Sequence, residues 1–318
     1  MLPTRRLGRT EMTPACLGLG GAWWGGADSG KDTTAGVGRA LELGMNFLDT
    51  YPGQGESFWG EVLSRNHREQ VYLQAKVSSH VGNEMRSDHS AGATRRSIEN
   101  SLRCFGTDYL DSVLIHGYDE PIDFGREPCD YLDPLAPGNA LDELIKLRDR
   151  GTVRHIGIGA RDAMVHQRAI ATGEIELVLT YLEYNLLTQA AEAELFPHCR
   201  EHDVGVILAS PLGMGLLTGR SVDDDDERRM IRDTKTPRAT RMLDWSRERG
   251  VDIRHLAIQF CLATPVESIV LPGQASADEV DGTYEAATTA IAAEIWRDFG
   301  QDFDIDVSHC LSPGADGP

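Results

Sequence analysis

Four polar residues that can exchange a proton with a carbonyl compound follow short apolar stretches of the chain. Asp49 and Tyr51 come after one such stretch, Lys76 ends the next, and His116 ends the one after that. A lysine ammonium held by a carboxylate lowers the pKa of a neighbouring phenol from about 10, which makes the phenol a usable proton donor. A histidine N–H can orient the carbonyl oxygen. Taken singly, the same residues also fit structural roles: a turn cap for Asp49, an ion pair for Lys76 and a buried ring for His116.

Short apolar runs along the chain can place these residues at one end of a sheet. The runs span residues 16–20, 46–50, 71–76, 111–116, 155–159, 177–180, 204–209 and 268–271. Segments with apolar residues three or four apart follow them, at 33–43, 57–63, 91–105, 139–150, 161–172, 190–202, 254–263 and 276–287. This α/β alternation favours a closed (β/α)8 TIM barrel over an open sheet with a second domain, and it predicts residues 1–318 as a single domain.

Segments outside this alternation complete the predicted fold. Residues 1–15, with Gly8 as the turn residue, are expected to form an N-terminal β-hairpin across the barrel floor, the alternative being a loose tail. Residues 117–138 and 212–237 are expected to form long loops at the C-terminal face, where such barrels carry their active sites.

The composition limits the classes of partner. The chain of 318 residues has 31 Lys and Arg against 50 Asp and Glu, a formal net charge of −19. Because this charge repels nucleic-acid phosphate and anionic lipid, neither nucleic acid nor a membrane is expected as a partner. The six cysteines form no C-x-x-C pair, and no secretory or membrane-spanning apolar segment is evident. Free thiols and a cytoplasmic location are therefore expected, whereas the oligomeric state stays undetermined.

Two loops have the character of nucleotide-binding segments. In residues 209–219, ASPLGMGLLTG, the glycines at 213, 215 and 219 can let backbone N–H groups approach phosphate oxygens, and Ser210 and Thr218 offer hydroxyl groups. Residues 271–276, LPGQAS, lead into a predicted helix N-terminus, which also favours an anion. An ordinary loop with Ser276 as helix N-cap is the structural alternative for the second segment.

Taken together, these motifs resemble the aldo-keto reductase family, whose members are single (β/α)8 barrels that transfer hydride to or from a nicotinamide cofactor. The similarity covers nearly the whole chain and includes RLGRT at 6–10, NFLDT at 46–50, LDSVLIH at 110–116, GTVRHIG at 151–157 and the loop at 209–219. Residues 177–181 and 209–218 look most like the aldose dehydrogenase branch. A carbonyl compound, a sugar or another polyhydroxylated small molecule is therefore the expected substrate.

The resemblance implies roles for individual residues. It assigns catalysis to Asp49, Tyr51, Lys76 and His116, with NADP(H) or NAD(H) as the cofactor and no metal. The cofactor-binding residues that it implies are Ala160, Arg161, Tyr181, Ser210, Pro211, Leu212, Gly213, Gly215, Leu217, Gly273, Gln274, Ser276 and Glu279.

The chain departs from the family pattern around the proton donor. Pro52 stands where the family has its tyrosine, and Tyr51 comes one residue earlier, only two residues after Asp49. The segment is therefore shortened, and Tyr118 and Tyr184 are the possible substitutes for Tyr51.

The expected nicotinamide subsite differs as well. Gly159 and Ala160 occupy the places of a Ser-Asn pair that grips the nicotinamide amide in the family, so Arg161 can hold the amide or the substrate instead. Tyr181 occupies the place of a glutamine and can stack on the nicotinamide ring.

A further departure bears on the choice between NAD and NADP. In many relatives a cation in the helix after residue 273 pairs with the 2′-phosphate of NADP, but this chain has Asp278 and Glu279 there. The charge favours NAD, although Arg220 can compensate, so both cofactors stay open.

Two kinds of function are consistent with these features. The leading hypothesis is an NAD(P)-dependent oxidoreductase. The alternative is a regulatory or non-redox barrel that binds the cofactor but has a degenerate active site, and the shortened Asp49–Tyr51 segment motivates it. The sequence decides neither the substrate nor the direction of the reaction.

Overall fold

The computed structural model describes residues 2–21, 33–50, 56–66, 68–77, 88–116, 132–218 and 229–311. Eight parallel strands follow one another around the sheet in chain order. They are β1 (Leu19–Gly20), β2 (Phe47–Asp49), β3 (Tyr72–Val77), β4 (Leu110–Ile115), β5 (Val153–Ala160), β6 (Leu177–Tyr181), β7 (Gly205–Ala209) and β8 (Ser268–Leu271). Bridges from Leu17 to Val270 and from Gly20 to Gly273 join the first strand to the last. The predicted (β/α)8 barrel is confirmed.

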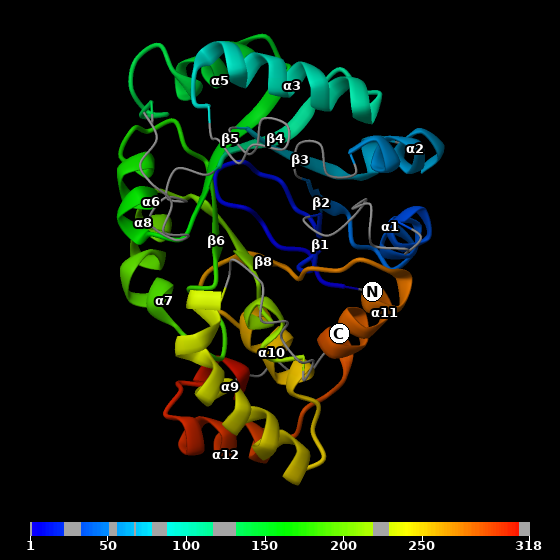
Figure 1. The fold of residues 1–318 in the computed structure, drawn as a ribbon, viewed down its shortest axis with the longest axis vertical. Helices are drawn as coiled ribbons and strands as arrows, with labels where there is room; N and C mark the ends of the chain where they lie inside the picture. Colours follow the sequence, from blue (N-terminus) through cyan, green and yellow to red (C-terminus); the bar gives the residue numbers. More distant parts are fainter. Residues whose placement is uncertain are drawn as a thin grey trace.

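The helices form an outer layer around the strands, as Figure 1 shows. Those that follow the early strands are α1 (Thr33–Glu42), α2 (Glu56–Asn66), α3 (Ala91–Phe105), α5 (Ala140–Asp149) and α6 (Ala163–Ile170). The later ones are α7 (Ala190–Glu194), α8 (Phe196–Glu201), α9 (Arg229–Glu248), α10 (Ile253–Leu262), α11 (Ala277–Thr288) and α12 (Ala293–Phe303). None of the described helices is long and apolar enough to cross a membrane.

Three helix predictions need correction. The helix expected at 190–202 is divided into α7 and α8, and Pro197 lies in the first turn of α8, where its missing N–H costs no helical hydrogen bond. The loop expected at 212–237 already contains the start of α9, which includes Pro237. Helix α12 was not predicted, although its buried Trp296, Phe299 and Phe303 recur at helical spacing.

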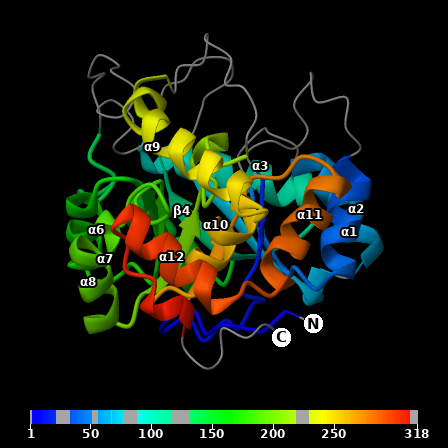
Figure 2. The same cartoon turned by 90° about the horizontal axis from the view of Figure 1, so that it is seen from below.

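The N-terminal hairpin covers one end of the barrel, as predicted, and Figure 2 shows it crossing that end. The N–H of Arg5 donates to Pro14 O at 2.8 Å, and that of Leu7 donates to Met12 O at 2.9 Å. Leu7 is fully buried and packs into the barrel interior with Phe47 of β2. Apolar side chains therefore fill the lower barrel, which leaves the C-terminal end of the strands for chemistry.

Candidate active site

A buried ion pair lies at the C-terminal ends of β2 and β3. The Nζ of Lys76 donates to both carboxylate oxygens of Asp49, at 2.6 Å and 2.5 Å, and to the backbone carbonyl of Thr50 at 3.2 Å. The Lys76 side chain is completely buried, and that of Asp49 is 7% exposed. The structure thus brings together two residues that lie 27 positions apart in the chain.

Strand alternation explains why these side chains meet. Successive strand residues face opposite sides of a sheet, so Asp49 shares the inward face with Phe47, which packs in the barrel interior. The strand register sets Asp49 opposite Gln74, and Lys76 follows two residues later on the same face. The inward face of β4 carries Ser112 and Leu114 in the same way.

The electrostatics of Lys76 reflect its burial. Loss of water contact lowers the pKa of the ammonium, and the adjacent carboxylate of Asp49 opposes this change. Glu56, at the start of α2, is a second buried carboxylate whose field favours the ammonium form. It is held by Ser101, whose Oγ donates to Glu56 Oε1 at 2.7 Å. Lys76 is therefore a buried cation that two acidic residues stabilise.

His116 follows β4 and is 7% exposed. A Cβ atom added to Gly159 would lie 3.5 Å from His116 Cδ2, so the glycine on β5 and the imidazole are close neighbours inside the barrel. The backbone N–H of His116 donates to Val77 O at 3.1 Å, directly after Lys76 in β3. The backbone of His116 is thus held beside the strand that carries Lys76.

The structure also bears on the proton donor. Tyr51 and Tyr118 lie outside the described residues. Tyr184 does not replace them, because its ring is buried among the helices outside the barrel, 5.2 Å from the Phe260 ring and 5.0 Å from the Phe196 ring. Burial also raises its pKa far above the ordinary value. Tyr184 is a core residue, and the suggestion that it substitutes for Tyr51 is wrong.

The segment after β7 is a tight loop with unusual backbone geometry. Ser210 has φ of 60° and Met214 has φ of 54°, values that side-chain-bearing residues rarely adopt. Gly213 N donates to Ser210 O at 3.0 Å, and Gly215 N donates to Leu212 O at 3.1 Å. The amides of these two glycines are therefore engaged in hydrogen bonds within the loop. The glycines also permit the turn, with φ of 58° and 94°.

The remaining predicted residues of this loop serve different purposes. Pro211, Gly213 and Leu217 are buried, whereas Ser210 and Leu212 are partly exposed. Strained non-glycine backbone persists where the surrounding structure enforces it, and it often marks a ligand-binding segment. Ser210 is partly exposed, and no hydrogen bond of its hydroxyl to another described residue is observed.

The segment after β8 holds a buried amide without a partner. Gln274 is 1% exposed, and neither its Oε1 nor its Nε2 has a hydrogen-bond partner in the described part of the protein. Such a group costs about 1–3 kcal/mol unless something supplies the missing bonds. Gly273, the preceding residue, lies beside Gly20 at the junction of the first and last strands. A polar ligand at this junction would satisfy Gln274.

A capping box follows at the start of α11. Ser276 Oγ accepts a hydrogen bond from Glu279 N at 3.4 Å, and the carboxylate of Glu279 accepts one from Ala275 N at 2.8 Å. Both interactions use donors of the helix N-terminus that would otherwise be open to an anion. Asp278 adds a second negative charge to the first turn. Ser276 is thus the N-cap of α11, which was the structural alternative to its expected role in cofactor binding.

The residues expected at the nicotinamide subsite divide between two faces of the barrel wall. Tyr181 ends β6 and packs against the apolar cluster of the interior. Ala160, by alternation from Gly159, has its side chain on the outer face. The Nε of Arg161 donates to Glu183 Oε1 at 2.5 Å, so this guanidinium is held at the rim between β5 and β6.

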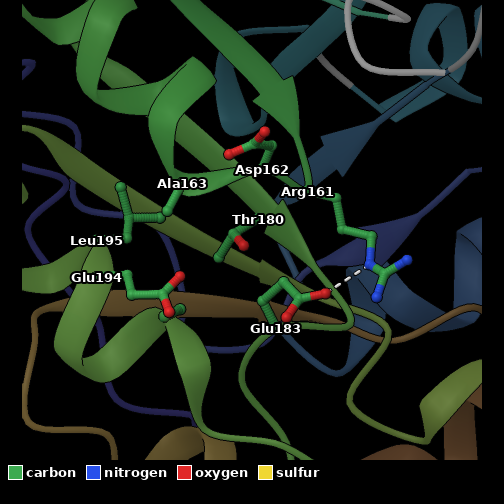
Figure 3. A pocket seen from close by; sticks show the side chains of 8 residues that line it. Arg161, Asp162, Ala163, Thr180, Glu183, Glu194 and Leu195 are labelled. Carbon is green, nitrogen blue, oxygen red and sulfur yellow. Dashed lines mark hydrogen bonds and ion pairs between the residues drawn. The ribbon is translucent and has the colours of Figure 1, made fainter. Parts of the chain in front are cut away.

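Figure 3 shows a cavity beside this ion pair. It has a volume of about 290 Å³ and is lined by Arg161, Asp162, Ala163, Thr180, Glu183, Ala191, Glu194 and Leu195. Thr180 belongs to the outward face of β6, and α6 and α7 supply other parts of the lining. The cavity therefore lies outside the barrel wall and is separate from the Asp49–Lys76 pair.

Sequence reasoning missed Gln74 and Ser112 as members of the site. Gln74 Nε2 donates to Asp49 Oδ1 at 2.7 Å, and Ser112 Oγ donates to Gln74 Oε1 at 2.9 Å. Each is a polar residue in an otherwise apolar strand, at a spacing that puts it on the same face as a predicted catalytic residue. Gln74 precedes Lys76 by two residues, and Ser112 precedes His116 by four.

Comparison with known proteins identifies the family. The model of the aldo/keto reductase family matches residues 16–299. The chain is 29% identical to L-galactose dehydrogenase of Arabidopsis thaliana, covering 89% of this chain and 88% of that protein. It is 26% identical to D-threo-aldose 1-dehydrogenase of a Pseudomonas species, with coverage of 82% and 85%.

A solved structure agrees with this assignment at the level of the fold. The holo form of an aldo-keto reductase from Bacillus halodurans superimposes with a TM-score of 0.72 at 24% identity, covering 97% of this chain and 99% of that one. The chain belongs to the aldo/keto reductase family and is an NAD(P)-dependent oxidoreductase. Its cofactor is a nicotinamide dinucleotide.

Proposed function

We propose that the protein is a dehydrogenase that oxidises a hydroxyl group of an aldose or a similar polyhydroxylated compound. The buried pair between Asp49 and Lys76 is the observation that carries the catalytic assignment, because it fixes a cation at the carboxyl end of the barrel strands, where such barrels carry their active sites. Two relatives that match over most of their length have names that specify sugar substrates, and this supports the substrate class.

A nicotinamide cofactor, when bound, would supply the acceptor for the hydride that leaves the carbon bearing the hydroxyl group. Tyr51, as phenolate, takes the hydroxyl proton, so that the alcohol loses one hydride and one proton and becomes a carbonyl compound. Lys76 stabilises the phenolate through its positive charge, and Asp49 holds Lys76 in place. His116 orients the substrate oxygen. In the opposite direction the same groups return the proton to a carbonyl oxygen.

The cofactor residues fit their proposed role unequally. Ser210, with its open hydroxyl and positive φ, and Gln274, with its buried unpartnered amide, are the strongest candidates for polar contacts with the dinucleotide. Leu212, Tyr181 and the remaining loop residues would supply apolar or backbone contacts. We assign no contact to Arg161, since Glu183 already engages its guanidinium.

The capping box of α11 supports NAD(H) as the preferred cofactor. Glu279 occupies the amide of Ala275, and together with Asp278 it places negative charge where a 2′-phosphate would need a cation. Nearby arginines are already engaged: Arg39 pairs with Asp281, and Arg254 pairs with Asp252. Repulsion of a dianionic phosphate at this end of the helix is therefore not compensated within the described residues.

The remaining proposals concern the protein as a whole. We infer that residues 1–318 form a single domain, that the partner is a small molecule, and that the protein works in the cytoplasm. The five described cysteines are free thiols, which supports a reducing compartment. The excess of acidic residues argues against nucleic acid and anionic membranes as partners.

The alternative of a regulatory or non-redox barrel is not favoured. Asp49 and Lys76 form a complete ion pair despite the shortened segment that follows them. The relatives reported above have the names of redox enzymes.

The decisive experiment measures the reduction of NAD⁺ and NADP⁺ by the purified protein with a panel of aldoses and polyols. Tyr51→Phe should reduce kcat by at least about a hundredfold if the phenol transfers the proton. Lys76→Met should act similarly, and Lys146→Met makes the same change at an exposed surface position as the control. Wild-type turnover that persists in both active-site variants would contradict the assignment, as would dinucleotide binding without any turnover.

A further inference from the structure

Two buried polar residues in the barrel interior have no role in the reaction described above. Gln74 on β3 and Ser112 on β4 are both completely buried. The other inward positions of the described barrel are mostly apolar, including Phe47, Leu114 and Leu179. Polar side chains at such depth are costly unless fully bonded, which suggests that they contribute something other than packing.

We propose that Ser112 and Gln74 form a positioning relay that sets the orientation of the Asp49 carboxylate and thereby the place of the Lys76 ammonium. The inference rests on the proposed function, in which Asp49 and Lys76 support proton transfer. Neither Gln74 nor Ser112 touches the reacting atoms, and both act through Asp49.

The geometry forms a continuous chain of hydrogen bonds across three adjacent strands. Ser112 Oγ donates to Gln74 Oε1 at 2.9 Å, and Gln74 Nε2 donates to Asp49 Oδ1 at 2.7 Å. Asp49 in turn accepts two hydrogen bonds from Lys76, at 2.6 Å and 2.5 Å. The strand register places Gln74 directly opposite both Asp49 and Ser112, so the backbone holds all three in line.

The direction of the relay follows from the chemistry of its ends. An ionised carboxylate only accepts hydrogen bonds, so the amide nitrogen of Gln74 must face Asp49. The amide oxygen then faces Ser112, whose hydroxyl donates to it. If the amide were turned over, its oxygen would meet the Asp49 oxygen, and two acceptors would be in contact. Asp49 therefore sets the orientation of the Gln74 amide, and Ser112 fixes its position by donating to the amide oxygen.

The relay limits the freedom of Asp49. With Gln74 bound to Oδ1, the carboxylate plane is held so that both of its oxygens contact Lys76 Nζ. Without Gln74 the carboxylate can rotate, and the ammonium can shift away from the position that stabilises a phenolate. Small displacements of a charged group reduce catalysis while leaving substrate binding largely intact.

A second route joins Gln74 to Lys76 through the backbone. The N–H and the Oγ1 of Thr50 both donate to Gln74 O, each at 3.0 Å, and the carbonyl of Thr50 accepts from Lys76 Nζ at 3.2 Å. Because this route uses only the backbone of Gln74, a side-chain substitution at position 74 leaves it in place. Such a substitution therefore tests the amide by itself.

The test compares Gln74→Met and Ser112→Ala with the wild type. Gln74→Met removes the amide at similar volume, and Ser112→Ala removes only the hydroxyl that donates to the amide oxygen. The controls are Gln259→Met, which changes a glutamine on α10 outside the barrel, and Ser268→Ala, which removes a buried strand hydroxyl remote from Asp49. Thermal unfolding verifies that each variant is folded.

Two readouts separate positioning from general structural damage. We expect Gln74→Met to lower kcat about tenfold and Ser112→Ala about threefold, with KM for substrate and cofactor changed by less than about threefold. In protein labelled with ¹⁵N at lysine, which occurs at only four positions, the Lys76 ammonium resonance, assigned by its loss in Lys76→Met, should shift in both variants and in neither control.

The outcomes distinguish the relay from the proposed function. An unchanged Lys76 resonance together with unchanged kcat in the folded Gln74→Met variant would overturn the relay. A shifted Lys76 resonance in both variants supports the relay, whether or not the wild type shows turnover. Absence of turnover in the wild type would contradict the proposed function and not the relay. Equal falls in kcat for the variants and their controls would also overturn the relay.

Discussion

The ammonium group of Lys76 on β3 lies within 2.6 Å of both carboxylate oxygens of Asp49 on β2, in a site that is almost closed to solvent. Burial of each charge costs solvation free energy, and the opposite charge beside it offsets that cost. The pair is therefore both a stability element and the electrostatic centre of the site, and the two properties can be measured separately.

Breaking the pair from one side should destabilise the protein strongly. Lys76→Met leaves the Asp49 carboxylate buried without its cation, and we expect a loss of about 3–5 kcal/mol in the free energy of unfolding. The double variant Asp49→Asn with Lys76→Met should recover about 2 kcal/mol relative to the sum of the single changes. Denaturant unfolding of all four proteins gives this coupling, and additive losses would show that the pair contributes no net interaction.

The stability of the protein should fall as the pH drops through the range in which His166 titrates. Burial lowers the pKa of His166 from 6.5 to about 4, and its Nε2 lies 3.0 Å from the carbonyl oxygen of Ala160. Between pH 6.5 and about pH 4 the imidazole is protonated in the unfolded chain but stays neutral in the folded protein. The contribution is therefore fully present above pH 6.5 and falls by about 3 kcal/mol as the pH approaches 4.

The measurement is the free energy of unfolding between pH 7 and pH 4 for the wild type and His166→Gln. The difference between the two proteins should narrow as the pH falls, because the variant lacks the titrating group. His202→Gln, at an exposed position, is the control. A difference that stays constant over this range would contradict the assignment of His166 as a buried neutral histidine.

Arg9 should matter for stability and not for turnover. Its guanidinium donates to three backbone carbonyls at the barrel floor, those of His202 at 2.8 Å, Gly173 at 2.9 Å and Ile175 at 2.7 Å. We expect Arg9→Met to lower the free energy of unfolding by about 2 kcal/mol while kcat stays within about twofold, because the chemistry lies at the opposite end of the barrel. Arg5→Met, at an exposed position in the same hairpin, should change neither quantity.

The choice of cofactor should respond to charge at the start of α11. Glu279→Arg removes a carboxylate and adds a cation, so kcat/KM for NADP⁺ relative to NAD⁺ should rise by at least about tenfold. Loss of the capping box should cost about 1 kcal/mol of stability. Glu294→Arg makes the same charge change in the first turn of α12 and serves as the control. A ratio that rises equally in both variants would indicate a general charge effect.

Much of the architecture was predictable because local pattern and barrel topology agree. Apolar runs of strand length alternate with helical segments, and few folds other than a barrel accommodate eight such repeats in order. The placement of Asp49 and Lys76 also followed from the sequence, since both end buried parallel strands whose carboxyl ends gather at one face. The split of α7 from α8 at Pro197 and the amphipathic pattern of α12 were visible as well, although the predicted boundaries missed them.

Other features were decided only by tertiary structure. Gln74, Ser112 and Asp49 lie far apart in sequence, and their contact depends on a strand register that closure of the whole barrel sets. The contacts of Arg161 and Tyr184 were likewise not evident from the sequence. Arg161 pairs with Glu183 at the rim, and Tyr184 packs among aromatic rings outside the barrel. The residue types at the ends of the apolar runs identify which strands carry reactive groups. The tertiary packing sets which face of the sheet each side chain occupies and which residue it contacts. A shift of one residue in the register of a strand would move all of its side chains to the opposite face.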